Sequence, residues 1–206
     1  MKRGKLFTMS GPSGVGKGTI VRELLKACPD LKLSVSCTTR QPRPGETEGV
    51  HYFFVSKERF EELAASGQML EWANVHGNCY GTPRGYVEQM LAQGYNVLLE
   101  IDVQGSLQVL ENMPETIGIF ILPPSRAELV RRLSGRGTEN KQQLETRIRN
   151  AEAEVKAAEK FPYLIVNATL SEAVRQVRSV IEAENLHDQK DALNKLYEEF
   201  EEAHSK

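Results

Sequence analysis

The chain has 206 residues, of which 40% are hydrophobic and 26% charged, and its formal net charge at pH 7 is −2. This length supports one substantial core, and the composition is ordinary for a soluble globular protein. The small net charge gives no reason to expect a nucleic acid or a membrane as a partner, so any anion site must be local. The three cysteines have no C-x-x-C spacing, which argues for reduced thiols and against zinc. With an N-terminal apolar stretch too short for a signal peptide, we expect a cytoplasmic protein.

The strongest motif lies at residues 11–19, between the apolar run at 6–9 and a helical pattern at 20–25. Its glycines let successive backbone N–H groups turn toward an anion, and the following helix adds the positive end of its dipole. Lys17 supplies a mobile charge for the β- and γ-phosphates of a nucleotide. The motif predicts a P-loop formed by Gly11, Pro12, Ser13, Gly14, Val15, Gly16, Lys17, Gly18 and Thr19. The alternative, a glycine-rich turn without a ligand, is disfavoured because strand, loop, lysine and helix follow in the required order.

The rest of the chain alternates between apolar runs and amphipathic helical segments. Runs typical of buried strands lie at 6–9, 97–101, 117–122 and 164–166. This alternation predicts an α/β fold with a parallel sheet covered by helices. Ser125 and Glu128 form a capping-box pattern before one helix, Gly94 follows the end of another, and the apolar spacing over 144–155 predicts one long helix.

Two segments depart from this alternation. Residues 34–84 contain short β-like pieces around a turn-rich stretch at 40–46, which predicts an inserted lobe. Residues 125–149 contain six arginines, interrupted by Gly135 and Gly137, which predicts a mobile basic cover. The core then comprises approximately residues 1–33, 85–124 and 150–185.

Further motifs follow the P-loop in a fixed order. They are Ser36-Cys37-Thr38-Thr39-Arg40-Gln41-Pro42-Arg43, Gly49-Val50-His51-Tyr52-Phe53-Phe54, Glu71-Trp72-Ala73, Tyr80-Gly81-Thr82, Glu100-Ile101-Asp102-Val103-Gln104-Gly105 and Gly135-Arg136-Gly137-Thr138. With this set the chain resembles the guanylate kinase family from about residue 5 to about residue 170. The resemblance implies a single domain with a P-loop NTPase core, a GMP-binding lobe at 34–84 and an arginine-rich lid at 125–149. It also implies an enzyme that transfers the γ-phosphoryl group of ATP to GMP, giving ADP and GDP.

By this resemblance Arg40 and Arg43 hold the phosphate of GMP together with Tyr52. Two arginines in a proline-stiffened turn suit a clamp on a dianion, although the pair alone would be typical of a solvated basic loop. Phosphoryl transfer has a loose transition state and depends on positioning and electrostatics. No catalytic base is required, because a phosphate monoester with a second pKa of about 6 is already largely ionised at neutral pH.

A guanine pocket needs a carboxylate opposite the N1 and N2 donors and hydroxyl donors opposite O6. The resemblance assigns Glu71 to the first role, and Ser36 and Thr82 to the second. Adenine would present an acceptor to Glu71, so rejection of the wrong base can be strong. Outside the family pattern, Glu71 would be interpreted as a surface residue. Tyr80 is expected to pack near the same site.

In the lid, Arg132, Arg136 and Arg147 correspond to arginines that by resemblance close on the ATP phosphates and the transferring group. Together with Lys17 and Arg40 they form the expected catalytic set. An arginine in such a position contributes a factor of about 10³ or more to the rate. Closure would also exclude water. Asn167 is a weaker candidate for contact with the ATP base or its surroundings.

Mg²⁺ is the expected cofactor, with ATP as donor. The usual P-loop hydroxyl for this ion is replaced by Gly18, so we expect Mg²⁺ to be held chiefly by phosphates and water. Thr19 and Glu100 are weak candidates for secondary support, including support through water. Glu100 and Asp102 follow a strand at the sheet edge where α/β folds bind ligands. By resemblance one faces the metal and the other the guanine or the arginine clamp, and Asp102 is placed with the GMP set.

Residues 186–206 extend beyond the resemblance and predict an amphipathic helix. Its apolar stripe consists of Leu193, Leu196, Tyr197 and Phe200. The stripe is expected either to pack on its own core or to form a homo-oligomer.

Two other functions remain as alternatives. One is a non-catalytic guanylate-kinase-like module that binds phosphopeptides, which has no use for Lys17 and the lid arginines. The other is a P-loop kinase for a different small phosphorylated acceptor, against which the guanine-edge residues argue.

Overall fold

The computed structural model of the chain describes residues 2–75, 77–134 and 141–187, with 193, 194, 196, 197 and 200 beyond them. Its central layer is a five-stranded parallel sheet in the order β2-β7-β1-β8-β9. The strands are β1 (Leu6–Ser10), β2 (Leu31–Leu33), β7 (Asn96–Glu100), β8 (Ile117–Leu122) and β9 (Tyr163–Val166). The α/β fold with a parallel core is therefore confirmed, and the short edge strand β2 is an addition to the predicted strands.

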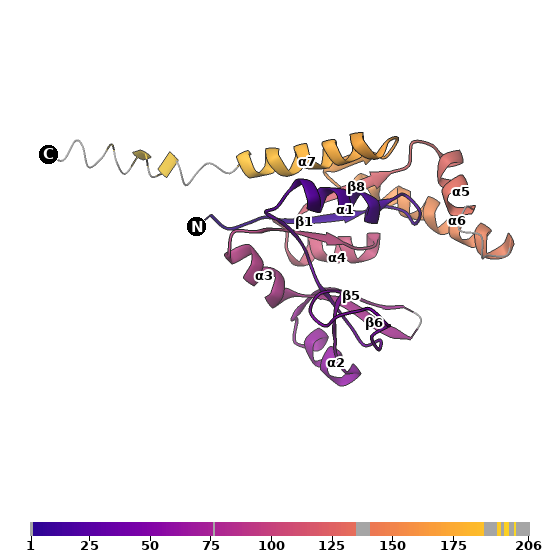
Figure 1. Cartoon of the computed structure of the whole chain (residues 1–206), viewed down its shortest axis with the longest axis horizontal. Helices are drawn as coiled ribbons and strands as arrows, with labels where there is room; N and C mark the ends of the chain where they lie inside the picture. Colours follow the sequence, from indigo (N-terminus) through magenta and orange to yellow (C-terminus); the bar gives the residue numbers. More distant parts are fainter. Residues whose placement is uncertain are drawn as a thin grey trace.

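Helices cover both faces of this sheet (Figure 1). On one face, α1 (Lys17–Ala27) and α7 (Leu170–His187) pack against the sheet through a shared apolar cluster. On the other face lie α3 (Arg84–Ala92) and α4 (Val103–Asn112), whose apolar residues form a second cluster with strands β1 and β7. Burial on both faces explains why the central strands β1, β7 and β8 are almost continuously apolar rather than alternating.

A second sheet lies beyond α3 and α4, in the order β4-β3-β6-β5. It comprises β3 (Ser36–Thr38), β4 (Tyr52–Phe54), β5 (Met69–Val75) and β6 (Asn78–Pro83), with α2 (Lys57–Ala65) packed on it. Cys37, Phe60 and Met69 form its buried centre. The antiparallel β5–β6 pair accounts for much of this sheet, and sequence patterning did not predict it.

The arginine-rich segment begins with α5 (Arg126–Ser134) and continues in α6 (Lys141–Lys156) and the 3₁₀ turn η1 (Ala157–Lys160). The Glu128 N–H donates to Ser125 Oγ over 3.1 Å, as the capping pattern predicts. Leu129 and Leu133 of α5 pack against Ala151 of α6. The predicted lid residue Arg136 lies outside the described residues.

Of the predicted C-terminal helix, only a few positions are described. The apolar side chains of Leu193, Leu196, Tyr197 and Phe200 are 43–55% exposed. In the described part of the chain, no helix combines the length and hydropathy needed to cross a membrane. The three cysteines are not joined by disulfides.

Candidate active site

The P-loop connects β1 to α1 at the carboxyl edge of the central sheet. Gly11 and Gly16 have φ angles of 146° and 100°, a region that favours glycine. A Cβ atom at Gly11 would lie 2.4 Å from the carbonyl oxygen of Ile121, so the loop also approaches β8 too closely for a side chain. No side chain caps α1 at Gly16, so the first N–H groups of the helix are available for an anion.

Lys17 begins α1 and lies across this loop. Its Nζ donates to the carbonyl oxygen of Gly11 over 2.6 Å. Burial lowers the pKa of Lys17, while the nearby carboxylates of Glu100, Glu154 and Asp102 counteract this effect. A partly desolvated ammonium group is well suited to bind phosphate oxygens, because it has less water to lose.

Arg132 of α5 binds the backbone of the P-loop. Its Nη1 donates to the carbonyl oxygen of Val15 over 3.1 Å, and its Nη2 donates to that of Asn167 over 3.1 Å. The Asn167 Nδ2 atom donates to the same Val15 oxygen over 2.8 Å. The Arg132 Nε atom donates to Glu128 Oε1 over 2.7 Å. The structure thus joins the predicted residues Arg132 and Asn167 to the loop through one carbonyl group.

Helix α6 contacts the same loop through Ser13. Arg147 Nη2 donates to Ser13 Oγ over 3.3 Å, which brings this predicted lid arginine to the P-loop. The Ser13 N–H donates to Glu154 Oε2 over 3.2 Å. Glu154 is a contact that sequence reasoning missed, because nothing local distinguishes it from the other glutamates of α6.

Glu100 ends β7 and lies beside Gly18. A Cβ atom at Gly18 would be 3.3 Å from Glu100 Oε1, so the carboxylate occupies space next to the missing hydroxyl. Desolvation raises the pKa of Glu100, and Lys17 opposes the rise. Thr19 is exposed on the first turn of α1. Within the described residues, no group of three or more His, Cys, Asp or Glu side chains is arranged to hold a metal ion.

Most of the predicted GMP residues surround a cavity of about 180 Å³ between the two sheets. Five of them line it, namely Ser36, Tyr52, Glu71, Tyr80 and Asp102. Glu100 lines it as well. Asp102 also caps α4, because its Oδ1 accepts the Gly105 N–H over 2.7 Å.

Glu71 is the buried carboxylate of this cavity, with a residue exposure of 8%. The hydroxyl of Thr82 donates to Glu71 Oε1 over 2.6 Å. Desolvation raises the pKa of Glu71, and the Thr82 hydrogen bond counteracts part of the rise. Thr82 has a single hydroxyl hydrogen and donates it to Glu71, so in this arrangement it does not also donate to O6 of guanine. Ser36 is then the remaining predicted donor to O6.

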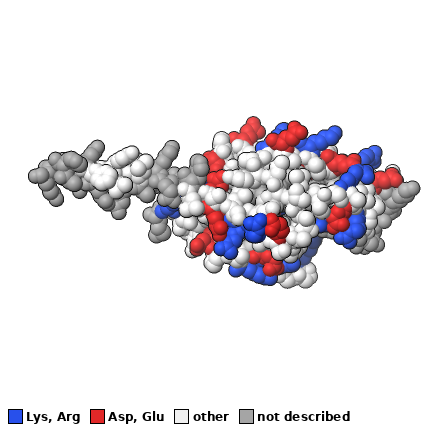
Figure 2. All heavy atoms as spheres, turned by 90° about the horizontal axis from the view of Figure 1, so that it is seen from above, with Lys and Arg blue, Asp and Glu red and all other residues white. Residues whose placement is uncertain are grey.

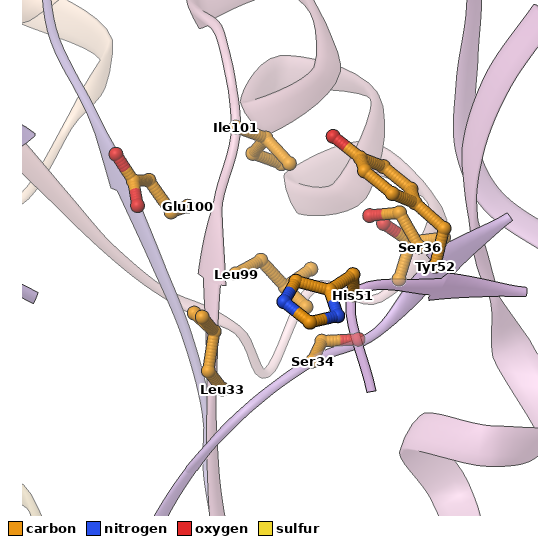
Figure 3. A pocket seen from close by; sticks show the side chains of 9 residues that line it. Leu33, Ser34, Ser36, His51, Tyr52, Leu99, Glu100 and Ile101 are labelled. Carbon is orange, nitrogen blue, oxygen red and sulfur yellow. The ribbon is translucent and has the colours of Figure 1, made fainter. Parts of the chain in front are cut away.

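A second cavity of about 170 Å³ adjoins the first and shares Ser36, Tyr52 and Glu100 with it. Figure 3 shows Glu100 on one side of this cavity and Tyr52 with Ser36 on the other. His51 lines it too, and its Nδ1 accepts the Thr47 N–H over 3.0 Å, so the proton of the neutral ring is on Nε2. Thr82 completes the predicted residues at this cavity.

The arginine clamp is organised by Glu46, a residue that the sequence analysis did not single out. Arg40 donates to both carboxylate oxygens of Glu46 over 2.9 and 3.0 Å, and the Arg43 N–H donates to Oε2 over 2.8 Å. The Arg40 hydrogen bonds, followed by that of the Arg43 backbone, lower the pKa of Glu46 to about 2. The Arg40 guanidinium also lies 5.4 Å from the ring centre of Tyr52, which packs edge-on against Tyr80.

Comparisons with known proteins agree with this geometry. The sequence model described as guanylate kinase matches residues 3–184. A guanylate kinase of Symbiobacterium thermophilum is 48% identical over 182 residues, which cover 88% of this chain and 86% of that protein. One from Streptomyces coelicolor is 51% identical over 175 residues, covering 85% and 89%.

The fold comparison points the same way. The crystal structure of guanylate kinase from Anaplasma phagocytophilum matches with a TM-score of 0.68 and 35% sequence identity, covering 89% of this chain and 87% of that one. With a family match over most of its length and relatives near half identity, the chain belongs to the guanylate kinase family.

Proposed function

We infer that this protein is a guanylate kinase that transfers the γ-phosphoryl group of ATP to GMP, giving ADP and GDP. One observation carries the inference beyond family membership. Glu100 lines both acceptor cavities and lies beside Gly18 of the P-loop, so the acceptor site adjoins the donor phosphates. Two phosphate-binding sites that share a wall are what direct transfer requires.

The residues support distinct roles in this reaction. The Glu71 carboxylate accepts from the guanine N1 and N2 donors, and Ser36 donates to O6. Arg40, held by Glu46, and Arg43 bind the phosphate of GMP with Tyr52 and leave its dianionic oxygen as the attacking group. No base is needed, because that oxygen is ionised near neutral pH.

On the donor side, the P-loop amides and Lys17 bind the phosphates of ATP. Arg132 and Arg147 already contact this loop through Val15 and Ser13. Since both guanidinium groups reach the loop, we assign them to the transferring phosphoryl group. Arg136 is assigned to the same group from the family resemblance alone. The regions 34–84 and 125–149 then act as GMP-binding lobe and lid of one domain.

The acceptor can be tested directly. Purified protein is assayed for ADP formation with ATP and GMP, AMP, CMP, UMP or ribose 5-phosphate as acceptor. Use of GMP at least 100-fold more efficiently than AMP is expected, because AMP would leave the buried Glu71 mispaired. No turnover with any acceptor would favour the phosphopeptide-binding module, and equal turnover with ribose 5-phosphate would favour a different small-molecule kinase.

Mg²⁺ is the proposed cofactor and, when bound with ATP, would neutralise charge on the β- and γ-phosphates. The oxygen donors Glu100 and Thr19 fit a hard cation, and Glu100 Oε1 lies 3.3 Å from the place that a Cβ atom at Gly18 would take. Both residues would support the ion chiefly through water.

We predict that Glu100→Gln raises the Mg²⁺ concentration for half-maximal activity about fivefold to tenfold, since one charged ligand contact is weakened. A titration of Mg²⁺ at fixed ATP measures this. Binding of Mn²⁺ with ATP, followed by electron paramagnetic resonance, provides a readout besides activity. Glu88→Gln, on the solvent side of α3, is the control. Identical Mg²⁺ curves for the two variants would remove Glu100 from the metal site.

We propose that the C-terminal stripe mediates self-association, because its four described side chains are about half exposed. A protein ending at Asn185 should sediment with a lower mass than the full chain at the same concentration. A Leu196→Glu, Phe200→Glu double variant of the full chain should behave like the truncated one. An unchanged oligomeric mass in both would refute this role.

Neither a nucleic acid nor a membrane is a proposed partner, and a cytoplasmic location fits the free thiols. On the face that Figure 2 shows, acidic side chains lie beside basic ones around a largely uncharged centre, so the basic groups are not set apart as a nucleic-acid surface would require.

A further inference from the structure

The contact between helix α4 and strand β5 joins the central sheet to the second sheet. Strand β5 is an edge strand, and α4 covers that edge. Asn112 Nδ2 donates to the carbonyl oxygen of Leu70 over 2.9 Å. Gln108 Oε1 accepts the Trp72 N–H over 3.2 Å. These bonds attach the backbone on both sides of Glu71 to one helix.

Packing strengthens the attachment. Leu70 is fully buried and belongs to the same apolar cluster as Val109 of α4 and Met113, which follows the end of that helix. The register of β5 against β6 shifts between Met69 and Glu71. Such an irregularity re-aims side chains, and here Leu70 enters the core while Glu71 lines the acceptor cavity.

Gly105 lies where the Glu71 carboxylate meets α4. A Cβ atom at residue 105 would be 2.9 Å from Glu71 Oε2 and 3.4 Å from its carboxyl carbon. The backbone of Gly105 is outside the left-handed region, so the requirement for glycine is space. Gly105, Gln108 and Asn112 are spaced by three and four residues and therefore lie on one face of the helix.

We propose that this face of α4 positions Glu71 for guanine recognition, with Gly105 as a positioning residue that admits the carboxylate. The expected effect on guanine recognition rests on the proposed function, whereas the contact between Gly105 and Glu71 does not depend on it. Alanine at 105 would displace the end of a flexible side chain rather than backbone. The chain would therefore fold, with the carboxylate moved away from its place beside Thr82.

The test compares Gly105→Ala with Gly85→Ala in the full chain. Gly85 lies in the first turn of α3, and a Cβ atom there would meet nothing within 4 Å. We expect Gly105→Ala to raise KM for GMP about tenfold. A displacement of about 1 Å in a binding group can lower the reaction rate by about 100-fold, and the shift of the Glu71 carboxylate should be smaller than that. KM for ATP should stay within twofold, and Gly85→Ala should change neither constant. An unchanged KM for GMP, or equal rises for both substrates, would overturn the proposal.

A thermal-unfolding cycle separates this proposal from the proposed function. Gly105→Ala should raise the melting temperature in a Glu71→Ala background, where alanine favours the helix and the 2.9 Å approach to the Glu71 carboxylate is gone, leaving only an ordinary 3.4 Å contact with Asp102 Oδ1. With Glu71 present, the rise should be lost or reversed. If the parent protein does not phosphorylate GMP, the proposed function fails, but the cycle still tests the positioning contact. Equal changes in melting temperature in the two backgrounds would overturn that contact, whereas unequal changes would support it.

Discussion

Replacement of Lys17 by alanine is expected to lower kcat by about 10²- to 10³-fold, because it removes a positioned charge from the transferring phosphates. The effect should fall on turnover more than on folding. Lys17 contributes one hydrogen bond to the carbonyl oxygen of Gly11, and its desolvation opposes the charged form. A coupled assay of ADP formation at saturating ATP and GMP measures the loss.

Lys26→Ala is the matched control for this experiment. Lys26 lies in the last turn of the same helix, α1, and pairs with Glu23 at the surface. Its loss should leave kcat within twofold, since exposed ion pairs contribute little. Thermal unfolding of both variants checks the fold. Near-normal turnover of folded Lys17→Ala protein would contradict the assigned role of the P-loop lysine.

Glu71→Gln should lower kcat/KM for GMP by about 100-fold, the size expected for a lost hydrogen bond to a charged group. The amide presents a donor where guanine also presents donors, while its oxygen can still accept from Thr82. ATP binding should be unchanged, because Glu71 lines the proposed acceptor cavity and is not part of the P-loop. Glu62→Gln, at an exposed position of α2, is the control. Equal losses of GMP and ATP binding would argue against the guanine assignment.

The pH dependence of stability provides a second test at Glu71. Burial raises its folded-state pKa above the usual 4.5, so the folded protein binds the proton more tightly than the unfolded chain. This contribution to stability is fully present below pH 4.5 and is lost as the pH rises through the folded pKa. Glu71→Gln should therefore gain stability relative to the parent at pH 7, and the difference should shrink toward pH 4.5. Denaturant unfolding at both pH values measures it, and a constant difference would show that the carboxylate is not destabilised by burial.

The sequence by itself determined the features that depend on short stretches of chain. The glycines and lysine at 11–19 specify a phosphate loop, because the backbone conformation and the helix dipole are local properties. Continuous apolar runs likewise predicted β1, β7 and β8, since a strand buried on both faces leaves that pattern. An apolar run also predicted β9, although this edge strand is partly exposed. The ordered motifs identified the family and, through the resemblance, predicted the GMP-binding residues.

Only the tertiary structure decided how these parts meet. The bond from Arg132 to Val15 spans 117 residues, and no spacing in the chain encodes it. Glu46 lies in the turn-rich stretch at 40–46, where the sequence suggested no role for it, yet its two oxygens fix Arg40. The fit of Glu71 against Gly105 depends on how β5 docks on α4, a packing arrangement set by many weak contacts between distant segments. Local chemistry thus predicted what each motif binds, whereas the packing of the two sheets determined which groups face one another.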